Sequence, residues 1–191
     1  MEHASLHFEY FGFTRGSEDI YEDSSGLREG HDIHSEAITE KAFHPTNTYT
    51  VREGSRVTAV DSVKMVEVLR IDKTMDSLFH LPSGDIPTPD DQFASAFKQR
   101  GYVLRGDTNI LVSGMSLKAH IWQLSERPSY LFEFKGLIVG NKANINGQEN
   151  ELRLMAIDTT SPIDAARFEP PHAFPLMDLT KESSNSPGSQ P

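Results

Sequence analysis

Residues 32–36 carry three side chains with metal-ligating chemistry at alternate positions. Asp32, His34 and Glu36 are spaced i, i+2 and i+4, so a β-strand would place them on one face. A set of carboxylates and an imidazole could bind a borderline cation. The whole segment is polar, however, and we favour a solvated strand face over a metal site. His31 lies out of phase with His34 on a regular strand, so these two histidines do not form a pair.

No residue pattern in the chain matches a complete catalytic site. Carboxylates are plentiful, but nothing places two of them in one pocket as acid and base. The chain has no Gly-x-Ser-x-Gly elbow, no Gly-x-Gly-x-x-Gly fingerprint and no Walker-type loop. Cysteine is absent, which removes disulfides, thiolate metal sites and cysteine nucleophiles together. We therefore expect a protein that is not an enzyme and that needs no cofactor.

Nine aromatic residues are the candidate ligand-binding side chains. They could line a cavity for a lipid or another apolar ligand. The alternative is an ordinary core between a sheet and helices, because large aromatic side chains fill cores by default. Residues 130, 132 and 134 would share one strand face, which suits either interpretation. The candidate set comprises Phe8, Tyr10, Phe79, Phe93, Phe97, Tyr102, Trp122, Phe132 and Phe134.

Short β-forming runs separated by turn signals must position these residues. Alternating hydrophobicity and aromatic or β-branched content predict the strands, and Gly30 predicts a bulge in the third of them. Helices are expected over residues 73–81 and from Asp90 to Gly101, with a proline-rich loop over residues 82–89 between them. The predicted strands cover residues 6–14, 18–22, 27–39, 46–53, 56–61, 63–71, 102–105, 115–124, 130–139 and 151–158.

Length and charge limit the organisation and the partners. A chain of 191 residues is long enough for one domain, and the polar residues 172–191 predict a disordered tail after it. The formal net charge of −10 argues against nucleic acid and against docking on an anionic membrane surface. A basic partner protein is compatible with it.

The sequence contains no apolar run of 18 residues, so we expect no membrane-spanning segment. No charged-then-apolar signal peptide opens the chain. Met1 could therefore begin a native cytoplasmic protein, or stand in front of a mature protein whose signal peptide was removed.

Three stretches of the chain resemble a known family. Residues 16–29 (GSEDIYEDSSGLRE) are similar to its early hairpin, in which Tyr-x-Asp leads to a turn glycine. Residues 106–122 resemble a strand that is entered through Gly114 and ends on Trp122. Residues 134–137 (FKGL), 157–159 (IDT) and 168–170 (FEP) are similar to its closing strands and Phe-x-Pro exit. The family is that of the LolA-like domains of the bacterial cell envelope, in particular secreted or lipid-anchored relatives of unknown function. One departure is that relatives often carry a cysteine shortly before the aromatic at Trp122, and this chain has none.

The resemblance covers roughly residues 6–171 and implies a LolA-like β domain over residues 5–171. The implied fold is mainly β: a strongly curved antiparallel sheet, or half-barrel, covered by short helices. The implied function is that of a non-enzymatic periplasmic or outer-membrane-associated protein that holds a lipid or other apolar ligand in its concave sheet. The alternative is an accessory subunit docked on a larger membrane protein complex. Fold alone does not decide between them.

Overall fold

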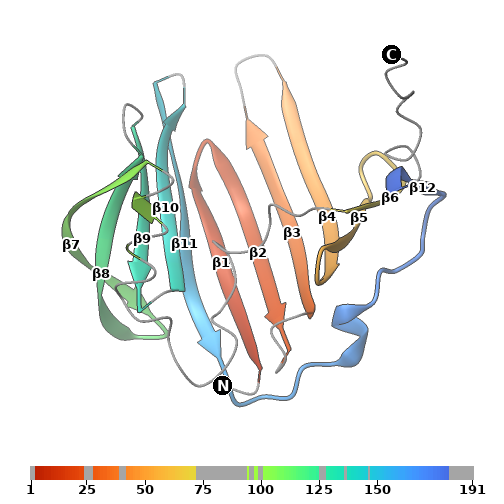
Figure 1. Ribbon diagram of the computed structural model, residues 1–191. Helices are drawn as coiled ribbons and strands as arrows, with labels where there is room; N and C mark the ends of the chain where they lie inside the picture. Colours follow the sequence, from red (N-terminus) through yellow and green to blue (C-terminus); the bar gives the residue numbers. More distant parts are fainter. Residues whose placement is uncertain are drawn as a thin grey trace, which may run out of the picture.

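A computed structural model of the protein describes residues 3–23, 28–38, 42–71, 94, 97–98, 101–124, 128–135, 137–145 and 147–180. In this part of the chain twelve strands form one sheet (Figure 1). The strands are β1 (Ala4–Gly12), β2 (Thr14–Glu22), β3 (Arg28–Ile38), β4 (Phe43–Glu53), β5 (Arg56–Asp61), β6 (Val66–Ile71), β7 (Tyr102–Val112), β8 (Met115–Leu124), β9 (Ser129–Phe134), β10 (Leu137–Ile145), β11 (Gln148–Asp158) and β12 (Leu176–Asp178).

The sheet consists of two antiparallel meanders placed side by side. The strand order is β12-β6-β5-β4-β3-β2-β1-β11-β10-β9-β8-β7. The pairing of β1 with β11 joins the meander β1–β6 to the meander β7–β11. Every pair is antiparallel except β12 with β6, which is parallel. The predicted mainly β, antiparallel architecture is therefore confirmed.

The sheet bends sharply at the end formed by β7–β11, on the left of Figure 1. Three strands separate β7 from β11, so a flat sheet would hold these two about 19 Å apart at about 4.8 Å per strand. Instead, Ser113 in the β7–β8 turn donates its backbone N–H to the carbonyl of Met155 in β11, at 2.9 Å. Its hydroxyl oxygen also accepts the N–H of Ile157. The sheet is curved but remains open, with β7 and β12 as its end strands.

Helical structure is sparse in the described residues. A 3₁₀ helix, η1, spans Ala165–Phe168, and Ala94, Phe97 and Lys98 are α-helical. The predicted cover of short helices is therefore not seen here, and the helix predicted over residues 73–81 lies outside the described residues. None of the described helices has the length and apolarity needed to cross a membrane.

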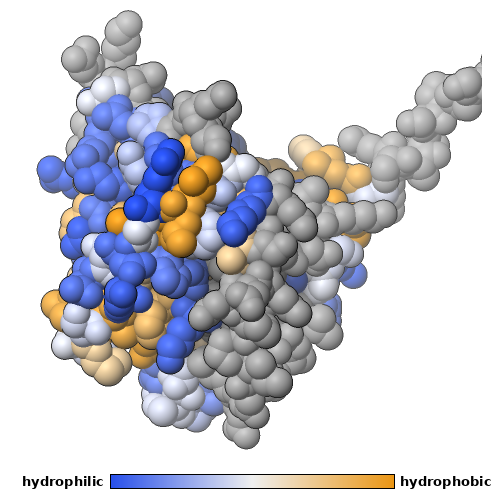
Figure 2. Space-filling model, turned by 60° about the vertical axis from the view of Figure 1, so that its left-hand side comes forward, coloured by the Kyte–Doolittle hydropathy of each residue, from blue (hydrophilic) through white to orange (hydrophobic). Residues whose placement is uncertain are grey.

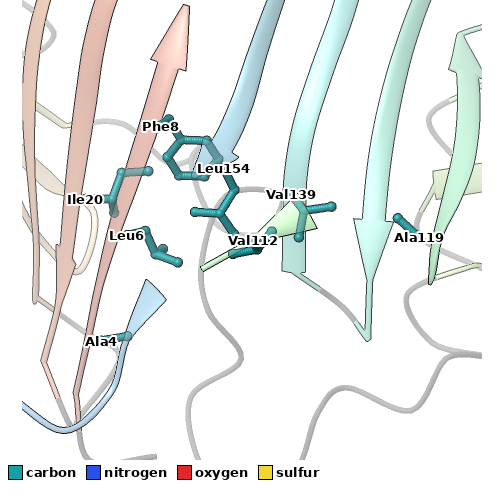
Figure 3. Packing of buried hydrophobic residues seen from close by; sticks show 8 residues of the cluster. All are labelled: Ala4, Leu6, Phe8, Ile20, Val112, Ala119, Val139 and Leu154. Atoms are coloured by element: carbon teal, nitrogen blue, oxygen red, sulfur yellow. The ribbon is translucent and has the colours of Figure 1, made fainter. Parts of the chain in front are cut away.

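Two hydrophobic clusters lie on opposite faces of β8 and β9. Successive side chains of a strand point to opposite faces, so Leu131 and Phe132 belong to different clusters. The smaller cluster comprises Phe97, Trp122, Leu131 and Ile138. The larger one joins both meanders (Figure 3) and comprises Ala4, Leu6, Phe8, Ile20, Val112, Ala119, Val139 and Leu154.

Leu154 occupies the centre of the larger cluster, next to Phe8 on β1 and fully buried. We expect Leu154→Ala to lower the free energy of unfolding by about 2–5 kcal/mol, because the cavity that it leaves cannot collapse completely. Leu111→Ala, at an exposed position on β7, should change it by less than about 0.5 kcal/mol. Urea denaturation of the two variants measures the difference, and equal effects would contradict the assignment of this cluster as the core.

Candidate binding groove beneath the C-terminal strap

Residues 159–178 cross one face of the first meander and are called the strap here. The strap leaves the end of β11, forms η1 and joins the edge of β6 as β12 (Figure 1). Its middle is anchored at Arg167. The Arg167 carbonyl accepts a hydrogen bond from the Tyr49 hydroxyl at 2.7 Å. The guanidinium lies 4.7 Å from the ring centroid of Tyr21 and 3.5 Å from a carboxylate oxygen of Asp32.

Gly30 allows the strap to approach the sheet closely. A Cβ atom at this position would overlap the carbonyl oxygen of Arg167 and lie 3.2 Å from the Tyr49 hydroxyl. The pairings of β3 with β2 and β4 run through Gly30 without a register shift. The bulge predicted at Gly30 is therefore wrong, and the glycine instead makes room for a crossing segment of backbone.

A groove of about 310 Å³ lies between the strap and the sheet, and we call it the strap groove. Its floor is a row of directly paired residues, Val51, Thr58 and Leu69, which point to the same face. Strap residues, Phe168 and Leu176 among them, form its other wall. The full lining comprises Arg28, Val51, Glu53, Arg56, Thr58, Glu67, Leu69, Phe168, Pro170, His172 and Leu176.

Charged residues lie on both sides of this apolar floor. On one side, Arg28, Glu53 and Arg56 are paired across β3, β4 and β5. Arg28 is held by Asp23 at 2.8 Å, and its guanidinium lies 5.1 Å from the ring centroid of Phe168. On the other side, the buried carboxylate of Glu67 lies 3.0 Å from Nδ1 of His172. The groove thus combines apolar surface with charge of both signs.

A chain of polar side chains lies on the opposite face of the first meander and shares the strands β3 and β4 with the groove. The Tyr10 hydroxyl donates to Glu18, whose other oxygen lies 3.3 Å from Nδ1 of His31. The other ring nitrogen of His31 contacts Glu29, and Glu29 pairs with Arg52 at 3.3 Å. Glu29 and Arg52 are buried. This chain ties β1, β2, β3 and β4 together, since each strand contributes at least one member.

The position of His31 between two carboxylates keeps it charged. Burial by itself would lower the pKa of His31. The hydrogen bonds and negative charges of Glu18 and Glu29 outweigh that effect and raise its pKa to about 9, from an ordinary value of 6.5. Burial and the Glu18 carboxylate likewise raise the pKa of the Tyr10 hydroxyl, so it stays protonated as a donor.

The predicted aromatic residues do not gather at one place. Phe8 is buried in the larger cluster, against which Phe132 and Phe134 pack. In the smaller cluster the Phe97 ring stacks on Trp122 with centroids 5.0 Å apart, and Tyr102 meets Phe97 edge-on at 5.1 Å. Tyr10 is half-buried and belongs to the polar chain. Phe79 and Phe93 lie outside the described residues.

The set Asp32, His34 and Glu36 is not assembled as a metal site in the described residues, where no group of three suitable side chains converges. Asp32 instead pairs with His34 at 2.8 Å and with Arg167 of the strap. His31 does face away from His34, as its odd spacing predicted, because it belongs to the buried polar chain.

Sequence reasoning missed the groove because its lining comes from four separate strands and the strap. Two signals were available. The Phe-x-Pro exit supplies Phe168 and Pro170, which both line the groove. Gly30, interpreted as a bulge, marks the place where the strap crosses. The predicted domain boundary at residue 171 falls within the strap, and β12 lies beyond it.

No family model matches the sequence, and no curated protein matches it. Solved structures do resemble it. An uncharacterised conserved protein from Thermus thermophilus is 9% identical, with 91% of this chain and 90% of that chain covered at a TM-score of 0.51. MucB is 12% identical, with 91% of this chain and 58% of MucB covered at a TM-score of 0.49. The Mycobacterium tuberculosis lipoprotein LppX is 11% identical, with 84% and 89% covered at a TM-score of 0.37.

At these identities the likeness concerns the fold alone. The structure from Thermus thermophilus aligns over nearly the whole of both chains, so the two proteins are similar in overall fold. The predicted resemblance to the LolA-like domains is confirmed at the level of the fold. This chain spans 58% of the length of MucB.

We expect Gly30→Ala to loosen the strap, because the added methyl group displaces the Arg167 carbonyl. Hydrogen exchange should accelerate in residues 165–178 and stay unchanged in β1 and β11. Gly54→Ala is the control: no atom lies within 4 Å of the added methyl group, although the positive φ of 57° adds local strain. If the strap of Gly30→Ala exchanged its amide hydrogens as slowly as that of the wild type, the close packing at Gly30 would be contradicted.

The charged state of His31 predicts a pH dependence of stability. Because its pKa in the folded protein exceeds the ordinary value, the folded state holds this proton more tightly than the unfolded state does. The stabilisation is complete below pH 6.5 and is lost as the pH rises through 9. Urea unfolding of His31→Gln should therefore show a flatter pH profile over about pH 6–10 than the wild type.

His44→Gln is the matched control for His31→Gln, because His44 is exposed on β4. We expect its profile to follow that of the wild type over the same range. If His31→Gln kept the full alkaline loss of stability, that loss would have to come from another group.

Proposed function

We propose that this protein is a non-enzymatic binding protein that holds a small apolar or amphipathic ligand in the strap groove. The observation that carries the proposal is the groove itself, with the apolar floor of Val51 and Leu69 covered by Phe168, Pro170 and Leu176. Ligand sites of small molecules are concavities of about 300–1,000 Å³ that combine apolar surface with polar groups that orient the ligand. At about 310 Å³ the strap groove suits a single aliphatic chain.

The strap groove is a more accessible candidate ligand site than the predicted set of aromatic residues. Phe8, Phe97 and Trp122 are buried and pack against other side chains of the protein. A ligand could reach them only by displacing core residues, at the cost of the packing that they make. The strap, by contrast, is held by separate anchors at Arg167, His172 and β12, so it can yield locally to a ligand.

An envelope location is part of the proposal, and its support is the resemblance to the LolA-like domains. The proposal contains no catalytic step, because the groove residues offer recognition by apolar contact and charge. The proposed role is therefore ligand binding in the periplasm or at the outer membrane.

An accessory role on a larger complex is the second candidate, and one observation favours it. The end strand β7 and its neighbour β8 expose several large apolar side chains: Val103, Leu104, Leu111 and Met115. On this side of the molecule, hydrophobic surface forms separate patches among hydrophilic ones (Figure 2). Native mass spectrometry of the purified protein separates the two roles: a co-purifying small ligand supports the first, and a partner subunit supports the second.

Neighbouring residues of β12 allow a matched test of the proposed groove. Leu176 lines it, whereas Met177 points to the other face of the strand; they are 54% and 52% exposed. We expect Leu176→Ser to weaken the binding of decanol roughly three- to tenfold, through the loss of about 1 kcal/mol of apolar contact. Met177→Ser should leave the affinity unchanged.

Isothermal titration calorimetry of the full chain measures both affinities. Equal weakening by the two substitutions would contradict a ligand site in the strap groove.

A further inference from the structure

The most deeply buried charged group of the strap groove is the carboxylate of Glu67. Its side chain is only 1% exposed, and it lies directly opposite Leu176 in the β6–β12 pair. A buried carboxylate needs a cation or hydrogen-bond donors, because the loss of its hydration is costly. Here Nδ1 of His172 lies 3.0 Å from Oε1, and the His172 side chain is 74% exposed. The partner of Glu67 is therefore a group on the strap that solvent already reaches.

We propose that the strap groove selects a primary ammonium group on an aliphatic chain, with the ammonium bound to Glu67 in place of His172. This inference rests on the function proposed above and names the class of its ligand. An ammonium group offers three N–H donors and a full positive charge, so it matches a carboxylate that is removed from water.

The apolar surface next to Glu67 gives the ligand chain its path. Leu69 lies two residues further along β6 and therefore on the same face as Glu67. Val51 continues this floor through Thr58, and Leu176 stands opposite Glu67 on the strap. An aliphatic chain whose ammonium group is at Glu67 would thus lie on Leu69 and Val51, covered by the strap.

The charges of the groove and of the whole protein favour a cation over an anion. The Arg28 guanidinium already pairs with Asp23, and Glu53 stands between Arg28 and Arg56 in the paired row. The carboxylate of Glu67, in contrast, is buried against the apolar floor. A formal net charge of −10 also raises the local concentration of cations and repels carboxylate ligands.

The first experiment compares three decyl compounds on the full wild-type chain, below the concentrations at which they form micelles. Calorimetry at about 0.15 M salt limits the contribution of distant surface charges. We expect decylammonium to bind at least about tenfold more tightly than decanoate, with decanol between them. Equal or tighter binding of decanoate overturns the inference while the proposed function stands. Failure of all three compounds to bind overturns the proposed function as well.

Substitution of the two groove carboxylates locates the ammonium group. Glu67→Gln retains the shape of the side chain and removes its charge, so it should abolish the preference for decylammonium over decanol. Glu53→Gln makes the same change of charge on the other side of the groove and should keep the preference within about twofold. The reverse pattern, or an unchanged preference in Glu67→Gln, overturns the assignment.

Decyltrimethylammonium provides a test on the wild type alone, in case Glu67→Gln does not fold. It has the charge of decylammonium but no N–H donor, so it should bind no better than decanol if Glu67 holds the head group by hydrogen bonds. Binding as tight as that of decylammonium would mean that charge alone is recognised, and would overturn the proposed contact.

Discussion

The pairing of β1 with β11 is the constraint on which the rest of this structure depends. It joins two meanders that would otherwise be separate, over a register from Ser5 opposite Asp158 to Gly12 opposite Asn150. Phe8 and Leu154 face each other within it, at the centre of the larger hydrophobic cluster. Because the strap continues directly from the end of β11, this pairing also sets the point from which the strap crosses the first meander.

The first meander uses its two faces for different purposes. One face carries the strap and its groove, anchored where Gly30 admits the Arg167 carbonyl. The other carries the buried polar chain, in which charged His31 and the Glu29–Arg52 pair link adjacent strands. Buried charges of this kind are costly unless each one is paired. The polar chain therefore restrains the register of β1–β4, which include the floor strand β4, because a slip by one residue would turn its members to the opposite face of the sheet.

Local patterns in the sequence were sufficient to predict most strands but did not predict where several of them begin and end. The early strand, the hairpin around Gly54 and the strand ending near Leu124 follow from alternation and turn residues, and the structure has strands there. Residues 130–139 were predicted as one strand, but a turn at Lys135, with φ of 50°, divides them into β9 and β10. The strand predicted over residues 102–105 ends too early, because β7 continues past the irregularity at Gly106 to Val112. Such breaks depend on which neighbouring strand is available to pair, and this information is not local.

The sequence by itself determined the class of the protein: mainly β, antiparallel, acidic, without cysteine chemistry and with a likeness to the LolA-like domains. Only the tertiary structure decided where a ligand site could form. Of the predicted aromatic residues, Phe8 and Phe132 belong to one cluster and Phe97 and Trp122 to another on the opposite face, because strand alternation separates Phe132 from Leu131 and Trp122. The groove instead arose from Val51, Leu69 and the strap, which are distant in sequence and meet only because β12 pairs with β6. Pairing of strands far apart in the chain, rather than any local pattern, creates that surface.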